Sequence, residues 1–215
     1  MKDKYILTAE SVTAGHPDKL CDTIADSILD ACLKEDPNAR VACEVLATAG
    51  KILVAGELRT TANPDVEAIV RQVVRNSGYD CNYHVEVRLH TQSPDIAGAV
   101  DGDTLGAGDQ GIMYGYACWE TVELLPAPVV LANRITSLLT TCREENLISG
   151  IGPDGKAQVS VQYAFGVPER VDTIVISCQH DADKDPDELR EELRRLVIAR
   201  ACHDVRIDEN TKIFI

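Results

Sequence analysis

The pattern of apolar residues predicts a helix that begins near His16. Apolar side chains recur four residues apart in this segment, a spacing that places them on one face of a helix. They are Leu20, Ile24, Ile28 and Cys32. Pro17 suits the first helical position, and Asp18 suits the first turn, where exposed backbone N–H groups favour a negative charge.

A β-hairpin is predicted next, because two β-like runs, 39–48 and 51–59, flank a small tight turn at Ala49 and Gly50. A two-residue loop fixes how the two strands pair. The pairs are Thr48 with Lys51, Glu44 with Ala55, and Ala42 with Glu57. Since side chains alternate along a strand, both glutamates then share one face as diagonal neighbours.

The rest of the chain mixes helices and strands, with one long loop between them. Helices are predicted after Asp65, after Pro128 and from Pro186. Strands are predicted over 84–90, 157–163, 171–178 and 211–215, a turn cluster over 150–155, and a long loop over 92–111. Hairpins lie between helices rather than in strict βαβ order, so the fold class is α+β.

Composition and charge narrow the class of protein. Of the 215 residues, 45% are hydrophobic and 26% are charged, as in ordinary globular proteins. The net charge of −14 disfavours nucleic acid and anionic membrane surfaces as partners. The first residues lack an apolar leader and no run of about 18 apolar residues follows, so a cytoplasmic location is expected. The eight cysteines form no C-x-x-C pair, which favours reduced core thiols over metal ligands or disulfides.

The segment G-H-P-D-K (15–19) carries the first candidate chemistry, because the N-terminus of a helix attracts anions. His16 could stabilise the charge of a phosphate or act as acid and base, Lys19 could attract phosphate, and Asp18 could hold a metal ion that phosphate also ligates. The alternative is simple capping and surface charge.

Three further groups of residues each allow two interpretations. Glu44 and Glu57 could hold a cation or an ammonium group, or could be neutralised by nearby arginines, Arg40 or Arg59. The glycine- and aspartate-rich loop 92–111 could be a lid over a ligand or a plain solvated loop. P-D-G-K (153–156) could contact a ligand or form a common β-turn.

Several long motifs, taken together, resemble the S-adenosylmethionine synthetase (methionine adenosyltransferase) family. They are E-S-V-T-A-G-H-P-D-K (10–19), the hairpin with its two glutamates, H-T-Q-S-P-D-I-A (90–97), G-A-G-D-Q-G-I-M-Y-G-Y-A (106–117) and P-D-G-K-A-Q-V (153–159). Their order and spacing match across nearly the whole chain. The resemblance implies mixed sheets with helices on one face, repeated in similar α/β domains. Residues 1–14 with 120–215 would form one domain, and 15–119 most of a second that includes a gating loop at 92–108.

The resemblance also implies an activity: ATP and L-methionine give S-adenosylmethionine, and the triphosphate is then split to phosphate and diphosphate. It implies catalytic roles for His16 and Lys156. The residues implied in ATP binding are Glu10, His16, Pro17, Lys19, Asp154 and Lys156. Those implied in methionine binding are Glu57, Gln92 and Asp109, and the implied metal ligands are Asp18 for Mg²⁺ and Glu44 for K⁺.

Family members are much longer and continue, after the strand matching T-K-I-F-I, into a glycine-rich loop with further phosphate ligands. A third domain and that loop are not part of this sequence. One expectation is therefore a subunit of a split enzyme, completed in a hetero-oligomer by a second chain. The alternatives are a non-catalytic chain that binds or regulates a synthetase, and a truncated fragment.

Overall fold

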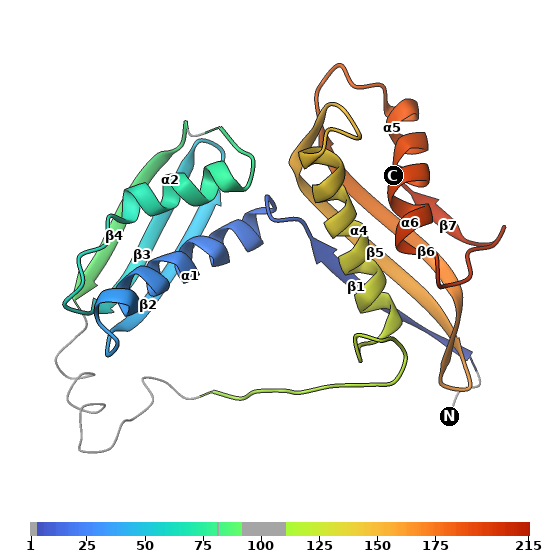
Figure 1. The fold of residues 1–215 in the computed structure, drawn as a ribbon, viewed down its shortest axis with the longest axis horizontal. Helices are drawn as coiled ribbons and strands as arrows, with labels where there is room; N and C mark the ends of the chain where they lie inside the picture. Colours follow the sequence, from blue (N-terminus) through green and yellow to red (C-terminus); the bar gives the residue numbers. More distant parts are fainter. Residues whose placement is uncertain (1–3, 81, 92–110) are drawn as a thin grey trace. The chain divides into compact units, whose positions relative to one another are not determined.

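The computed structural model describes residues 4–80, 82–91 and 111–215, and its contacts divide the chain into two compact units. Unit 1 comprises Met1–His16 and Gly115–Ile215, and unit 2 comprises Pro17–Tyr114. Each unit contains one mixed sheet with helices (Figure 1). The predicted α+β class is therefore confirmed.

Unit 2 is a three-stranded sheet in the order β2-β3-β4 with two helices on one of its faces (Figure 1). Its elements are α1 (Pro17–Glu35), β2 (Arg40–Thr48), β3 (Lys51–Arg59), α2 (Val66–Asn76) and β4 (His84–Thr91). Strands β2 and β3 are antiparallel, and β3 and β4 are parallel. The predicted apolar face of α1 is confirmed, since all four of its residues are buried against Ile52 and Val54 of β3.

The predicted register of the hairpin is also confirmed. Thr48 pairs with Lys51, Glu44 with Ala55, and Ala42 with Glu57. The helix predicted after Asp65 is present as well, and the Asp65 carboxylate caps it by accepting a hydrogen bond from the backbone N–H of Ala68.

Unit 1 is a four-stranded sheet in the order β1-β5-β6-β7, in which β7 is an edge strand. The strands are β1 (Lys4–Val12), β5 (Ile151–Ala164), β6 (Val167–His180) and β7 (Lys212–Phe214). The helices are α4 (Ala127–Glu144), α5 (Pro186–Leu193), the π-helical turn η1 (Arg194–Ile198) and α6 (Ala199–Ala201). The charged helix predicted from Pro186 is thus interrupted by one wider turn.

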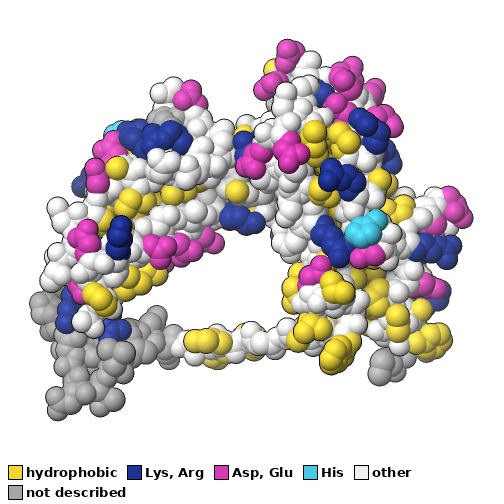
Figure 2. Space-filling model, in the orientation of Figure 1, with side chains coloured by type: hydrophobic (Ala, Val, Ile, Leu, Met, Phe, Trp, Pro, Cys, Tyr) yellow, Lys and Arg dark blue, Asp and Glu magenta, His cyan; other side chains and the backbone are white. Residues whose placement is uncertain are grey.

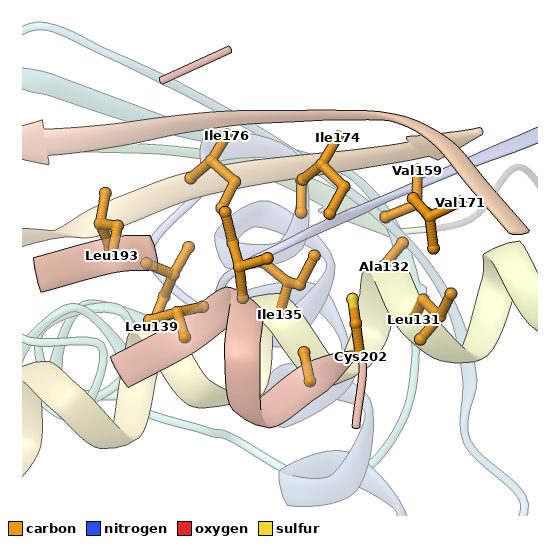
Figure 3. Close-up of a cluster of buried hydrophobic side chains, with 14 of the residues drawn as sticks. Leu131, Ala132, Ile135, Leu139, Val159, Val171, Ile174, Ile176, Leu193 and Cys202 are labelled. Carbon is orange, nitrogen blue, oxygen red and sulfur yellow. The ribbon is translucent and has the colours of Figure 1, made fainter. Parts of the chain in front are cut away.

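The core of unit 1 lies between the sheet and its helices. Leu131 and Ile135 of α4 and Leu193 of α5 pack with Val159 of β5 and Ile174 of β6 (Figure 3). Of these five side chains, none is more than 1% exposed. The opposite face of the sheet, at the positions alternating with this core, carries mainly polar side chains and is not covered by these helices.

The prediction of a turn over 150–155 is correct at Gly150 and wrong for the residues after it. Gly150 has a φ of +74°, as a turn requires, but β5 begins directly after it at Ile151. The pairing of β5 with β6 slips between Ile151 and Gly155. Pro153 has no N–H to donate, and a strand tolerates that defect best at such an irregularity. P-D-G-K is therefore the irregular beginning of a strand rather than a β-turn.

The acidic stretch 181–192 is largely exposed, as a solvated loop and helix face would be. Figure 2 shows Asp and Glu side chains gathered at the end of unit 1 where α5 begins. Asp185 caps α5 by accepting hydrogen bonds from the backbone N–H groups of Asp187 and Glu188. These acidic residues thus have a local structural role at the beginning of a helix.

Candidate functional site

Within unit 1, the turn that carries His16 is bonded to the beginning of β5. The backbone N–H of Thr13 donates to the carbonyl of Gly155 over 2.9 Å, and the N–H of His16 donates to the carbonyl of Thr13 over 3.1 Å. The Thr13 hydroxyl also donates to the carbonyl of Pro153 over 2.7 Å. The two motifs are about 140 residues apart in sequence, and the pairing of β1 with β5 brings them together.

Two of the predicted nucleotide ligands form an ion pair beside this junction. The Lys156 ammonium lies 2.9 Å from the Glu10 carboxylate, and both side chains are about half exposed, at 42% and 52%. An exposed pair of this kind contributes only about 0–1 kcal/mol of stability. An anionic ligand can therefore take the place of Glu10 at Lys156 at little energetic cost.

Asp154 stands on the same segment and is held by its backbone. Its N–H donates to the side-chain oxygen Oε1 of Gln179 on β6 over 3.2 Å. Because this bond uses the main chain, the carboxylate remains available to a ligand. Sequence reasoning missed both Gln179 and Thr13, since nothing in the local pattern shows that their side chains bind the beginning of β5.

The beginning of α1 presents the remaining residues of the G-H-P-D-K motif. Pro17 is the first residue of the helix, Asp18 lies in its first turn, and Pro17, Asp18 and Lys19 are all exposed. Free N–H groups at a helix N-terminus attract anions such as phosphate. These three residues belong to unit 2, and they follow His16, the last residue of the first segment of unit 1.

Glu44 and Glu57 lie on the open face of the unit 2 sheet, and both are exposed. Glu57 pairs with Ala42 of β2 on one side and with His90 of β4 on the other. The residues directly opposite the two carboxylates are therefore small or polar: Ala55 opposite Glu44, and Ala42 and His90 on either side of Glu57. This arrangement can receive an ammonium group or a monovalent cation.

A third glutamate on this open face is already engaged. Hydrogen bonds from Lys51 and, at 2.8 Å, from Arg88 lower the pKa of the Glu86 carboxyl to about 2. Two cationic partners leave this carboxylate no unbalanced charge to attract a further cation. Glu44 and Glu57 are therefore better placed than Glu86 to receive a positively charged ligand.

Two of the predicted methionine ligands, Gln92 and Asp109, lie outside the described residues, as does the predicted gating loop 92–108. Within residues 4–80, 82–91 and 111–215, no three His, Cys, Asp or Glu side chains form a cluster that could hold a metal ion. Asp18 and Glu44 are thus each a single carboxylate. Mg²⁺ commonly binds to one or two carboxylates together with substrate phosphates, so the chemistry of Asp18 fits that ion.

Comparison with known proteins gives consistent matches over both units. The family model described as the N-terminal domain of S-adenosylmethionine synthetase matches residues 4–102, and the model of the central domain matches residues 104–215. Among the described residues, no helix has the length and apolar character needed to span a membrane.

Curated relatives named S-adenosylmethionine synthase are similar over most of this chain. The protein from Finegoldia magna is 45% identical over 97% of this chain and 58% of its own length. The protein from Nitratiruptor sp. is 49% identical over 85% of this chain and 50% of its own length. The protein from Desulfosudis oleivorans is 45% identical over 98% of this chain and 58% of its own length. The chain therefore spans about half the length of the curated relatives it matches.

Proposed function

The chain belongs to the S-adenosylmethionine synthetase family, and from that premise we propose that it contributes half of a methionine adenosyltransferase active site. The reaction converts ATP, L-methionine and water to S-adenosylmethionine, phosphate and diphosphate. The observation that carries the proposal is the junction in unit 1, where the turn bearing His16 is bonded to the strand bearing Asp154 and Lys156.

Four residues of unit 1 would surround the nucleotide: Glu10, His16, Asp154 and Lys156. His16 would meet the triphosphate near the C–O bond that breaks and stabilise the charge that develops on the departing oxygen. Lys156 would exchange its contact with Glu10 for a contact with the nucleotide, which the modest strength of that exposed pair allows. Asp154, whose main chain is fixed by Gln179, would present its carboxylate to the same ligand.

The exposed beginning of α1 would contribute to phosphate binding. Pro17 and Lys19 would face the triphosphate, with the helix N-terminus adding its partial positive charge. Asp18 would hold Mg²⁺ together with the phosphates, and the ion would balance part of their negative charge.

The open face of unit 2 would contribute to the methionine and K⁺ sites. Glu57 would hold the methionine ammonium group, and Glu44 would line the site of K⁺, since both carboxylates are exposed on one face. Gln92 and Asp109 would complete the methionine site, and the segment 92–108 would cover it.

In this reaction the protein would position the two substrates and stabilise the charge on the leaving oxygen. The methionine sulfur displaces the triphosphate from the ribose C5′ carbon in line, so a C–S bond forms as the C–O bond breaks. Holding the reacting atoms in a near-attack geometry can lower the barrier of such a step by roughly 7–11 kcal/mol. The residues of this chain would hold the two substrates and the leaving oxygen in that geometry.

A second chain would supply the rest of the site in a hetero-oligomer. The chain covers 50 to 58% of its curated relatives, and its net charge is −14. A triphosphate carries about four negative charges. Lys19, Lys156 and Mg²⁺ bring about four positive charges, but the carboxylates of Glu10, Asp18 and Asp154 at the same site offset most of them. Further basic residues on a partner chain, which would also carry the third domain, would correct that deficit.

The test is the rate of S-adenosylmethionine formation from ATP and isotopically labelled methionine. The chain alone is expected to be inactive, and its mixture with a polypeptide matching the C-terminal half of the Desulfosudis oleivorans relative is expected to be active. In the mixture, Lys156→Ala should lower kcat/KM at least about 100-fold, whereas Lys34→Ala, at an exposed lysine in the last turn of α1, should leave it unchanged.

Two results would contradict the proposal. Equal activity of the single chain and the mixture would exclude a split enzyme. An inactive mixture, together with an inactive complex isolated from the source cells, would exclude catalysis by this chain.

A further inference from the structure

We propose that Thr13 is a positioning residue, whose hydroxyl fixes the turn bearing His16 against the strand bearing Asp154 and Lys156. The inference rests on the proposed function, because it assigns to Thr13 the alignment of that site. Thr13 touches neither substrate in this account. It acts through the backbone of the residues that do.

The hydroxyl of Thr13 is buried and bonded to the beginning of β5. Thr13 is 5% exposed. Its Oγ1 lies 2.7 Å from the carbonyl oxygen of Pro153 and 3.3 Å from that of Gly155. A hydroxyl has one proton to donate, so the shorter contact, to Pro153, is the principal bond. The backbone N–H of Thr13 donates to Gly155 as well, over 2.9 Å.

The beginning of β5 depends on such outside partners, because its own ladder is irregular there. The pairing of β5 with β6 slips between Ile151 and Gly155. Thr13 binds the segment from the end of β1, and Gln179 binds the Asp154 N–H from β6. The segment that carries Asp154 is thus held from both neighbouring strands.

The close approach of Gly15 is a second, independent sign that this turn is pressed against β5. A Cβ atom added at Gly15 would lie 2.5 Å from the carbonyl oxygen of Pro153 and 2.6 Å from its Cβ atom. Both atoms belong to a rigid residue in a strand, so only glycine fits at this distance. His16 follows directly, and its N–H donates to the Thr13 carbonyl over 3.1 Å.

Loss of the hydroxyl should therefore disturb alignment more than affinity. A displacement of about 1 Å between reacting groups can cost roughly 100-fold in rate. In the active complex, Thr13→Val should lower kcat about 10- to 100-fold with a smaller change in the KM for ATP. Thr13→Ser keeps the hydroxyl and should restore kcat to within about threefold of the original.

The control is Thr140→Val. Thr140 also donates its hydroxyl to a backbone carbonyl, that of Thr136 over 3.2 Å, but within α4. Its replacement should leave kcat and KM unchanged. We therefore expect kcat to be highest in Thr140→Val, where it equals that of the original complex, lower in Thr13→Ser and lowest in Thr13→Val.

A second readout tests the contact without any activity. Amide hydrogen exchange of the single chain, followed by NMR, should be at least about tenfold faster at His16 and Asp154 in Thr13→Val and unchanged in Thr13→Ser. Unchanged exchange in Thr13→Val would overturn the inference, and so would equal loss of kcat in the serine and valine variants. If the original complex proves inactive, the proposed function fails, and exchange alone decides whether Thr13 fixes the turn.

Discussion

The hydrogen bond between Tyr163 and Glu120 provides the sharpest test of how unit 1 is held together. Tyr163, in β5, is 0% exposed, and its hydroxyl donates to Oε2 of Glu120 over 2.5 Å. The same carboxylate oxygen accepts a bond from the N–H of Ala127, the first residue of α4, over 2.9 Å. One carboxylate thus joins the sheet to the beginning of the main helix.

Tyr163→Phe removes the hydroxyl and leaves the rest of the packing intact. The ring still stacks on Tyr5, with ring centroids 5.1 Å apart, so the variant leaves no large cavity. A hydrogen bond to a charged group contributes about 1.5–3 kcal/mol. Burial, together with the bond to Glu120, raises the pKa of Tyr163 above its ordinary value, so the phenol stays protonated and the bond persists at neutral and mildly alkaline pH.

The assay is urea unfolding of the single chain, with a thermal melt beside it. The free energy of unfolding of unit 1 should fall by about 1.5–3 kcal/mol, and its Tm by roughly 6–12 °C, since a unit of this size loses about 4 °C for each kcal/mol. Tyr5→Phe is the matched control: among the described residues, the Tyr5 hydroxyl has no hydrogen bond of its own. A Tyr163→Phe variant as stable as Tyr5→Phe would refute the reasoning.

Three further predictions concern stability and reactivity. The Ile24 side chain of α1 is 0% exposed, so Ile24→Ala should lower the free energy of unfolding of unit 2, measured in urea, by about 2–5 kcal/mol. Asp26 is exposed, and Asp26→Ala should change that free energy by no more than about 0.5 kcal/mol. The folded pKa of Glu86, about 2, lies below its unfolded value of about 4.3, so its ion pairs stabilise the fold above that pH. The Tm difference between the original chain and Glu86→Gln should be full at pH 6 and shrink as the pH falls toward 2; a difference independent of pH would contradict this. Burial raises the pKa of Cys202 to about 11, so iodoacetamide at pH 8 should alkylate it at least about 100-fold more slowly than in the urea-unfolded chain, as mass spectrometry of timed samples can measure.

The local patterns of unit 2 could be predicted from the sequence for a physical reason. Apolar residues four apart define one face of a helix wherever it packs, so the buried positions of α1 could be read directly. In the hairpin, a two-residue loop fixes which residues face each other. The shared face of Glu44 and Glu57 followed from that loop alone.

The beginning of β5 could not be predicted in the same way. Glycine, proline and aspartate over 150–155 have strong local turn preferences. Contacts made by Thr13 and Gln179, each from another strand, override these preferences and hold the segment as an irregular strand. The sequence pattern within 150–155 does not indicate contacts with residues that are distant in sequence.

The junction at the candidate site has the same origin. The turn that carries His16 meets the beginning of β5 because β1 pairs with β5, a contact across most of the chain. Neither motif contains information about that pairing, and only the resemblance to a family related the two in advance. The parallel pairing of β6 with β7 is another distant contact of this kind.

The native mass of the complex isolated from the source cells, through a tag on this chain, tests the central claim most directly. We expect a mass that requires a second chain in fixed ratio, one that carries the remaining half of the synthetase with its glycine-rich, lysine-containing loop. A mass that corresponds only to copies of this chain would contradict the account of a split methionine adenosyltransferase.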